Sequence, residues 1–375
     1  MNDTLATKVK YNLDQAHNLY ISRENPISLV HFVTNRCNAR CSFCFIDFND
    51  PSVFKGELSL EEIDKMTKKL GPNLLNVNLT GGEPFARKDF LEISKCYLEN
   101  TKIKSLFITS NGSLPDRVDT YLTDISGEYP DRKVLMQFSI DDFPDKHDQI
   151  RKIDGLFEKC MKSYNISAGY GGNVQGTVAI TISHENYKSV EALYDYLTVT
   201  RGVKSIAVNI VRDEGVYKIP VEHKEKMLSS YKILSNRVAE DMKSGILQGW
   251  NNRTVQGRLM NKKNEIWRDV LADIYMDNKY VTPCRAGAIF GVIEANGKVR
   301  PCEILDTDFG NVRDHDYNLI GLWKSKDSVS KKEKILETKC NCHYDCAWSF
   351  NILANREFQP KLLPSIISLK RSKRS

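Results

Sequence analysis

The sequence has no long hydrophobic run and little excess charge. Its first ten residues lack the apolar core of a secretion signal, and no apolar run is long enough to cross a bilayer. The 54 basic and 48 acidic side chains leave a net charge of +6, which by itself does not indicate nucleic-acid binding. We therefore expect a cytoplasmic protein with no transmembrane segment and no nucleic-acid partner.

Disulfides are not expected either, because nothing in the sequence indicates secretion. The ten cysteines instead fall into groups, with three between residues 37 and 44 and five between residues 284 and 346. Cys96 and Cys160 stand alone in helix-like segments, and we expect them to be small core residues. The two groups are the candidates for metal chemistry.

The first group, Cys37, Cys41 and Cys44, has the spacing C-x3-C-x2-C and follows an apolar run at residues 27–34. A tetrahedral zinc site needs four ligands, usually from two separated C-x2-C pairs, and the sequence offers no fourth ligand nearby. Three thiolates on a cubic iron–sulfur cluster leave one iron open, where a substrate or cofactor can bind. The spacing favours such a cluster, and three buried or zinc-bound cysteines are the alternative.

Six apolar, β-branched runs alternate with amphipathic helical patterns along the first part of the chain. The alternation predicts a parallel α/β sheet with right-handed crossovers, whose strands are covered on both faces. Ser59 and Glu62 have the spacing of a capping box and predict the start of one helix. In parallel barrels the chemistry lies at the carboxyl ends of the strands. The expected strands are residues 27–34, 74–80, 104–110, 134–140, 174–182 and 205–211.

The three-cysteine loop resembles the cluster-binding loop of the radical S-adenosylmethionine (SAM) enzymes. In that family the open iron of a [4Fe-4S] cluster chelates the amino and carboxylate groups of SAM, and one electron then cleaves SAM to a 5'-deoxyadenosyl radical. The six runs match the partial (β/α)6 barrel of the family. The resemblance implies SAM and a [4Fe-4S] cluster as cofactors. It also implies a reductase or a flavodoxin- or ferredoxin-type protein as electron donor.

The same resemblance implies contacts with SAM from the cysteine loop and from the turn after the second run. Phe43 matches the aromatic residue that lies near the adenine. Residues 80–84 match the segment that binds the SAM amino group, with Gly81 and Gly82 allowing a close backbone approach and Glu83 accepting a hydrogen bond. Residues 110–112 match a further turn of the family.

Strand-end residues later in the barrel complete the implied SAM site. Ser139 and Asp141 match the strand end that contacts the ribose hydroxyls. Arg151 matches the residue that pairs with the SAM carboxylate, a contact suited to a planar guanidinium. We expect His147, between them, to be a surface or loop-capping residue.

The chain changes character after the sixth run. Asn209, Arg212, Asp213 and Glu214 lie at or beyond its end, where they either face the substrate or belong to a solvated loop. Residues 216–280 are polar and largely helical, and we expect them to form a helical bridge with a solvated surface.

The second cysteine group surrounds a predicted hairpin. The dipeptide Asn296-Gly297 between two apolar runs predicts a tight β-turn. This region resembles the C-terminal auxiliary-cluster extension called SPASM, or its shorter relative called twitch. The resemblance implies one auxiliary [4Fe-4S] cluster, since five cysteines are too few for two. A zinc knuckle that uses His343 is the alternative. The implied ligands are Cys284, Cys302, Cys346 and one of Cys340 and Cys342, of which Cys342 fits the family spacing better.

The sequence thus predicts five segments. They are a lead-in at residues 1–26, a radical SAM partial barrel at 27–215, a helical bridge at 216–280, a hairpin-plus-helix auxiliary-cluster domain at 281–358 and a basic tail at 359–375, which we expect to be a disordered end.

The expected function is hydrogen abstraction from an unactivated C–H bond by the 5'-deoxyadenosyl radical, with an auxiliary cluster assisting a net oxidation. The single auxiliary cluster favours a small polar metabolite or a sugar as substrate. A SPASM-type maturase that modifies a ribosomally made peptide is the alternative. A non-catalytic iron–sulfur or zinc protein is the alternative of another class. The sequence identifies no general base.

Overall fold

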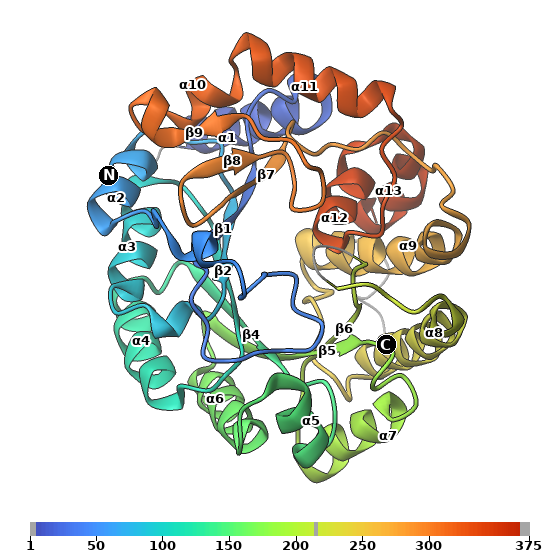
Figure 1. Cartoon of the computed structure of the whole chain (residues 1–375). Coiled ribbons are helices and arrows are strands. Elements are labelled where there is room, and N and C mark those ends of the chain that lie inside the picture. Colours follow the sequence, from blue (N-terminus) through green and yellow to red (C-terminus); the bar gives the residue numbers. More distant parts are fainter. Residues whose placement is uncertain (1–4, 214–216, 368–375) are drawn as a thin grey trace.

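The structure, a computed structural model, describes residues 5–213 and 217–367. Six parallel strands form its centre, and helices surround them in Figure 1. The predicted parallel α/β barrel is therefore confirmed, and strand bounds differ from the expected ones by at most two residues at either end. The strands are β1 (Ser28–Thr34), β2 (Asn76–Gly81), β3 (Ser105–Ser110), β4 (Lys133–Ser139), β5 (Val174–Ile182) and β6 (Ile206–Ile210).

Helices alternate with these strands as the sequence predicts. Ser59 and Glu62 form the capping box at the start of α2: the Ser59 hydroxyl accepts from the Glu62 N–H, and the Glu62 carboxylate accepts from the Ser59 N–H. The barrel helices are α2 (Leu60–Lys68), α3 (Phe90–Asn100), α4 (Pro115–Glu128), α5 (Pro144–Arg151), α6 (Leu156–Tyr170) and α7 (Val190–Asp195). Cys96 in α3 and Cys160 in α6 are buried.

The predicted hairpin extends the barrel sheet. Its strands are β7 (Phe290–Ile293) and β8 (Lys298–Arg300), followed by β9 (Gly310–Asn311). β7 pairs in parallel with β1, from Ser28 opposite Phe290 to His31 opposite Ile293. The strand order is therefore β6-β5-β4-β3-β2-β1-β7-β8-β9. The barrel strands and the C-terminal hairpin thus belong to one sheet.

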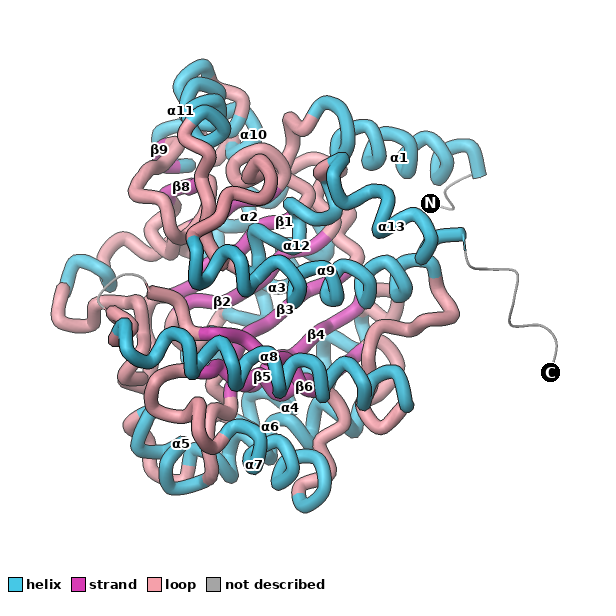
Figure 2. The backbone as a smooth tube through the Cα atoms, turned by 90° about the vertical axis from the view of Figure 1, so that its right-hand side faces the viewer, coloured by secondary structure: helices cyan, strands magenta, loops and turns pink. Residues whose placement is uncertain are grey.

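Two long helices cover the barrel between β6 and the C-terminal elements. α8 (Val221–Ser244) and α9 (Val255–Asp277) occupy the segment where a helical bridge was expected. The expectation of a solvated surface was wrong for one face, because α9 buries Trp267 and stacks it on Trp348, with ring centroids 5.4 Å apart. Figures 1 and 2 show both helices between β6 and α12 (Asp345–Ala354).

The remaining helices flank the hairpin and the N-terminal end of β1. None of the helices in the described ranges is long and apolar enough to cross a bilayer. The expectation of a disordered end was wrong for residues 359–367, which form a helix that packs on α9 and buries Leu362. Residues 368–375 lie outside the described part. These elements are α1 (Leu5–His17), the π-helix η1 (Asn18–Ser22), α10 (Leu319–Trp323), α11 (Lys326–Glu337), the short η6 (Arg356–Phe358) and α13 (Gln359–Ile367).

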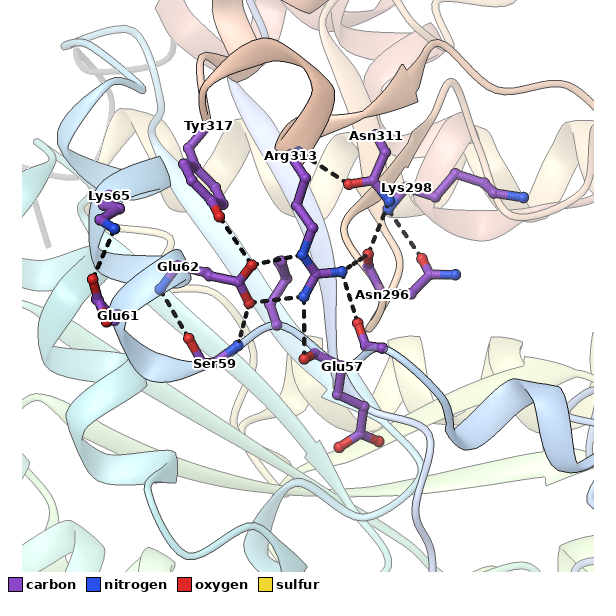
Figure 3. Close-up of polar contacts among 12 residues, drawn as sticks. Glu57, Ser59, Glu61, Glu62, Lys65, Asn296, Lys298, Asn311, Arg313 and Tyr317 are labelled. Atoms are coloured by element: carbon purple, nitrogen blue, oxygen red, sulfur yellow. Dashed lines mark hydrogen bonds and ion pairs between the residues drawn. The ribbon is translucent and has the colours of Figure 1, made fainter.

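A polar network joins α2 to the C-terminal region. Arg313 donates to both carboxylate oxygens of Glu62, at 2.6 and 2.7 Å, and Tyr317 donates to the first of them at 3.0 Å (Figure 3). Arg313 also donates to the carbonyl oxygens of Gly56 and Asn296, both at 2.9 Å. Arg313, which follows β9, therefore joins α2 to the Asn296 turn of the hairpin.

Candidate active site

The three cysteines of the first group face one cavity of about 400 Å³ at the carboxyl ends of the barrel strands. Cys346, of the second group, lines the same cavity. The cavity thus lies between the two cysteine groups that the sequence singles out. Its size is that of an ordinary small-ligand site.

The turn after β2 holds the first cysteine loop through its backbone. The Gly82 N–H donates to the Thr34 carbonyl at 2.8 Å, and the Glu83 N–H donates to the Arg36 carbonyl at 2.9 Å. A Cβ on Gly81 would lie 2.0 Å from the Thr34 oxygen, and one on Gly82 would lie 2.2 Å from the Arg36 oxygen. Both positions require glycine because the cysteine loop approaches so closely.

The other side of the cysteine loop is bound to α5. The Arg40 N–H donates to the Arg151 carbonyl at 3.0 Å, and the Ser42 N–H donates to the Ile150 carbonyl at 3.1 Å. Burial raises the pKa of the Cys37 thiol to about 12, while its sulfur accepts from the Ala39 N–H at 3.3 Å. A bound metal deprotonates such thiols, and N–H donors to sulfur tune an iron–sulfur cluster. Three thiols and these donors around one cavity fit such a cluster.

Glu83 is fully buried and ties two turns together. Its carboxylate accepts from the Phe85 N–H at 3.0 Å, the Ser110 hydroxyl at 2.9 Å and the Asn111 N–H at 2.7 Å. Burial raises its pKa to about 7. The Asn111 amide in turn donates to the Cys37 sulfur at 3.8 Å. Glu83 does not line the cavity, so this placement favours a role in positioning the loop; the expected contact with the SAM amino group stays a prediction.

Arg151 and Asp141 form a buried ion pair. Arg151 Nε donates to Asp141 Oδ2 at 2.8 Å, and the other Asp141 oxygen accepts from the Thr181 N–H at 3.1 Å. Arg151, Ser139 and Phe43 line the cavity, whereas Asp141 lies behind Arg151. The geometry leaves Ser139 and Arg151 as candidates for SAM contacts and favours a supporting role for Asp141.

His147 lies under this pair. It is fully buried, so the surface alternative for it was wrong. Its Nδ1 accepts from the Asp141 N–H at 3.2 Å, which is the expected capping role. Burial holds its pKa well below the ordinary value of 6.5, and a neutral ring is the form that can accept this bond.

The cavity wall also contains two residues that the sequence did not identify, Glu303 and Trp267. Glu303 accepts from Arg212 at 2.5 Å and from the Tyr344 hydroxyl. The Arg212 guanidinium lies over the rings of Phe45 and Tyr344, about 5 Å from each centroid. The position of Glu303 directly after Cys302 was the available clue. Trp267 of α9 lines the same cavity, and only its tertiary packing reveals that.

The other residues expected at or beyond the end of β6 do not all face the cavity. Asn209 lines the cavity, whereas Asp213 pairs with Lys224 of α8 at 3.3 Å. Glu214 lies outside the described residues.

All five cysteines of the second group lie in one apolar cluster beside the hairpin. Cys284 and Cys302 are buried, and their sulfurs accept from the N–H groups of Ala286 and Leu305 at 3.5 and 3.4 Å. The Cys340 thiol hydrogen-bonds to that of Cys284. Five thiols with amide donors fit an iron–sulfur cluster, and the structure leaves open whether Cys340 or Cys342 is the spare one.

Residues 32–197 match the family model described as the radical SAM superfamily. These residues therefore form a radical SAM domain, the domain of enzymes that bind SAM on a [4Fe-4S] cluster. The C-terminal thiols agree with the further cluster that we expected.

Its relatives include two proteins of Bacillus subtilis. The chain is 25% identical over 330 residues to the sporulation killing factor maturation protein SkfB, covering 84% of this chain and 68% of that protein. It is 23% identical over 331 residues to the antilisterial bacteriocin subtilosin biosynthesis protein AlbA, covering 84% and 65%. The chain thus spans about two thirds of the length of both.

Solved structures have the same fold. The anSMEcpe protein with bound AdoMet matches with a TM-score of 0.58 at 20% identity, covering 91% of this chain and 98% of that one. Streptococcus suis SuiB matches with a TM-score of 0.56 at 16% identity, covering 89% and 74%. Each match covers more of the chain than the barrel alone.

Proposed function

We propose that this protein modifies a ribosomally made peptide by abstracting a hydrogen atom from an unactivated C–H bond. One observation carries the proposal: the first cysteine loop and Cys346 line a single cavity. The bound cofactors would supply a 5'-deoxyadenosyl radical there and a second redox centre beside it. The named relatives are a maturation protein and a bacteriocin biosynthesis protein. Two structural neighbours hold a peptide, anSMEcpe with Kp18Cys and SuiB with its precursor SuiA. These similarities favour the peptide over the small metabolite that we first expected.

The floor of the cavity suits an uncharged polar group such as a peptide unit. Strands β2 to β6 line it with the carboxamides of Asn78, Gln137 and Asn209 and with hydroxyls, and none of their described side chains there is charged. The Asn78 Oδ1 atom is buried without a hydrogen-bond partner in the described structure. A carboxamide offers both an acceptor and donors, which is the complement of a backbone amide. We infer that Asn78 accepts from a substrate N–H.

Aromatic side chains form much of the remaining wall. Phe32, Phe45, Phe107 and Trp267 line the cavity. Such walls exclude water from a reactive radical and pack against an apolar side chain of the substrate. We therefore expect an apolar side chain of the substrate against these rings; Arg212 and Glu303, which also line the cavity, neutralise each other as an ion pair.

The test is turnover of candidate substrates by the reconstituted protein under anaerobic conditions. We expect SAM cleavage to 5'-deoxyadenosine together with a mass change in a precursor peptide encoded beside the gene. A sugar turned over in its place would refute the peptide proposal. Asn78→Leu should weaken peptide binding about tenfold, the loss of roughly one hydrogen bond, and leave SAM binding unchanged.

Metal analysis tests the second cysteine group. We expect about eight irons and eight sulfides per chain, as in two cubic clusters. Cys302→Ala should lower both counts to about four. Cys340→Ala and Cys342→Ala, compared with each other, identify the spare cysteine as the one whose loss leaves the counts unchanged. Zinc in place of iron would overturn the assignment.

A further inference from the structure

A second cavity, of about 410 Å³, lies away from the active site and is lined by Tyr20, Ile21, Arg23, Arg285, Arg356 and Glu357. We call it the three-arginine cleft. It shares none of its described lining residues with the active-site cavity. Arg23 precedes the amino end of β1, whereas the first cysteine loop follows its carboxyl end. The two cavities therefore lie at opposite ends of this strand.

The arginines of the cleft lack anionic partners. In the described part of the chain, none of the three lies within ion-pair distance of a carboxylate. Arg23 donates to the carbonyls of Leu19 and Ala354, at 3.4 and 2.8 Å, and Arg285 Nε donates to Asn355. Glu357 is the one acidic lining residue, and it accepts from the Thr282 hydroxyl at 3.1 Å.

The positive charges are close enough to repel one another. Burial and then the charge of Arg356 lower the pKa of Arg23. Burial and then the charge of Arg23 lower the pKa of Arg285 to about 10. The charge of Glu357 in the same cleft offsets this repulsion only in part, since the pKa values of Arg23 and Arg285 are still lowered, and partly buried like charges cost folding free energy. The cleft therefore suits an acidic ligand.

The cleft adjoins the second cysteine group. Arg285 directly follows Cys284, so their Cα atoms are about 3.8 Å apart. The Arg285 N–H donates to the Asn351 side chain at 2.8 Å, and Asn351 also hydrogen-bonds to the Cys284 thiol. A protein docked over the cleft would contact Arg285, the residue next to Cys284, and would therefore lie close to one of the five thiols.

We propose that the three-arginine cleft is the docking surface for an acidic one-electron carrier protein of the flavodoxin or ferredoxin type. The proposal rests on the proposed function, because it needs a redox centre on the second cysteine group. The carrier takes one electron from that centre, which is thereby oxidised, and the carrier is reduced by one electron. No covalent bond forms or breaks, and any proton that the carrier takes up comes from solvent.

Charge and position favour this occupant over an acidic segment of the substrate peptide. Electrostatic docking of small, transient redox partners is steered by complementary charge and needs little buried area. A peptide bound in the cleft would also have to reach the active site past the length of β1, about 23 Å for its seven residues. Because Cys284 is next to the cleft, a carrier docked there would be close to a redox centre held by this cysteine. A peptide would gain nothing from that position.

Binding of oxidised flavodoxin to the reconstituted protein, measured by anaerobic titration calorimetry, tests the proposal. Arg356 is exposed, and Arg356→Glu takes the cleft from a net charge of +2 to zero. We expect Kd to rise about tenfold at low salt and the difference to shrink at high salt. Glu357→Gln should lower Kd about threefold. Arg253→Glu, an exposed site outside the cleft with the same change in total charge, should change Kd less than twofold.

Electron transfer gives a second measurement. After photoreduction of the protein, the rate of flavodoxin reduction in stopped flow should fall in Arg356→Glu and rise in Glu357→Gln. Equal binding and equal rates in wild type and Arg356→Glu, at a full count of about eight irons, would overturn the docking proposal alone. A count of about four irons would instead overturn the auxiliary cluster itself. If an acidic peptide, and not flavodoxin, loses affinity in Arg356→Glu, the cleft is a peptide site and the proposal is wrong.

Discussion

Removing the guanidinium of Arg313 should loosen the C-terminal region from the barrel. Arg313 forms a bidentate pair with Glu62 and also donates to the backbone carbonyls of Gly56 and Asn296 (Figure 3). Asn296 keeps a second donor, the Asn311 amide at 2.9 Å, so Arg313→Ala leaves mainly Glu62 and the exposed Gly56 carbonyl without this partner. The contact connects elements about 250 residues apart in the sequence, and no covalent link replaces it.

The magnitude follows from the pair's geometry and exposure. Hydrogen bonds from the Arg313 guanidinium, which contribute most, and from the Ser59 N–H and the Tyr317 hydroxyl together lower the pKa of Glu62 from 4.5 to about 2. A shift of that size corresponds to about 3 kcal/mol before solvent screening. The Glu62 and Arg313 side chains are 19% and 33% exposed, so screening reduces the value. We expect a coupling energy between the two side chains of about 1–2 kcal/mol.

A double-mutant cycle isolates that coupling. Wild type, Arg313→Ala, Glu62→Gln and the double variant are compared by anaerobic thermal unfolding of the reconstituted protein. The neighbouring pair Glu61 and Lys65, in the same helix and drawn in Figure 3, is the control, because both side chains are at least half exposed. The Glu61→Gln and Lys65→Ala cycle should show no measurable change in Tm.

The pH dependence of the coupling gives a further check. A carboxyl whose folded pKa is depressed stabilises the fold above its unfolded pKa of about 4.5, and the stabilisation is lost as the pH falls from there toward 2. The Arg313–Glu62 coupling should therefore be constant between pH 8 and pH 5.5. A coupling near zero, or one that changes within this range, would refute the reasoning that the pair holds the C-terminal region to the barrel.

Three further predictions concern the site. Gly82→Ala should abolish iron binding by the first cysteine loop, because its Cβ meets the Arg36 carbonyl at 2.2 Å, whereas Gly127→Ala, in an open helical position, should leave the iron count unchanged. Glu83→Gln should gain stability relative to wild type as the pH rises from 5.5 to 8, since burial raises the Glu83 pKa to about 7 and its ionisation disfavours the folded state; parallel Tm curves would contradict this. Trp267→Ala should cost about 3–5 kcal/mol in thermal unfolding and weaken peptide binding; an unchanged Tm would show that its stacking is unimportant.

Local sequence patterns predicted the barrel well because each of its strands is specified by a short stretch of sequence. Apolar runs, the capping box at Ser59 and the turn at Asn296-Gly297 each specify a structure within a few residues. The cysteine spacings likewise predict two candidate metal-binding groups from short stretches of sequence. These features need no knowledge of distant contacts.

The rest of the site depends on tertiary contacts that no local pattern records. The polar composition of α9 suggested a solvated helix, yet one face of it buries Trp267 in the cavity wall. In the sequence, Glu303 resembles any other acidic residue. Its contact with Arg212, 91 positions earlier, is visible only in the folded structure. Asp141 carries the expected strand-end position, but the buried Arg151 occupies its carboxylate and places it behind the cavity.

Pairing between β1 and β7 sets the position of the first cysteine loop relative to the second cysteine group, of which Cys346 lines the same cavity. β1 leads directly into the first cysteine loop, and β7 lies between Cys284 and Cys302 of the second group. Because the two strands are hydrogen-bonded in one register, the relative position of the groups is set by the sheet itself. A shift of one residue would exchange the two faces of β1, both of which are buried, and would move His31 away from its hydrogen bond with Tyr97. The cavity between the groups thus has a rigid frame, which the proposed abstraction of one hydrogen atom by a radical would require.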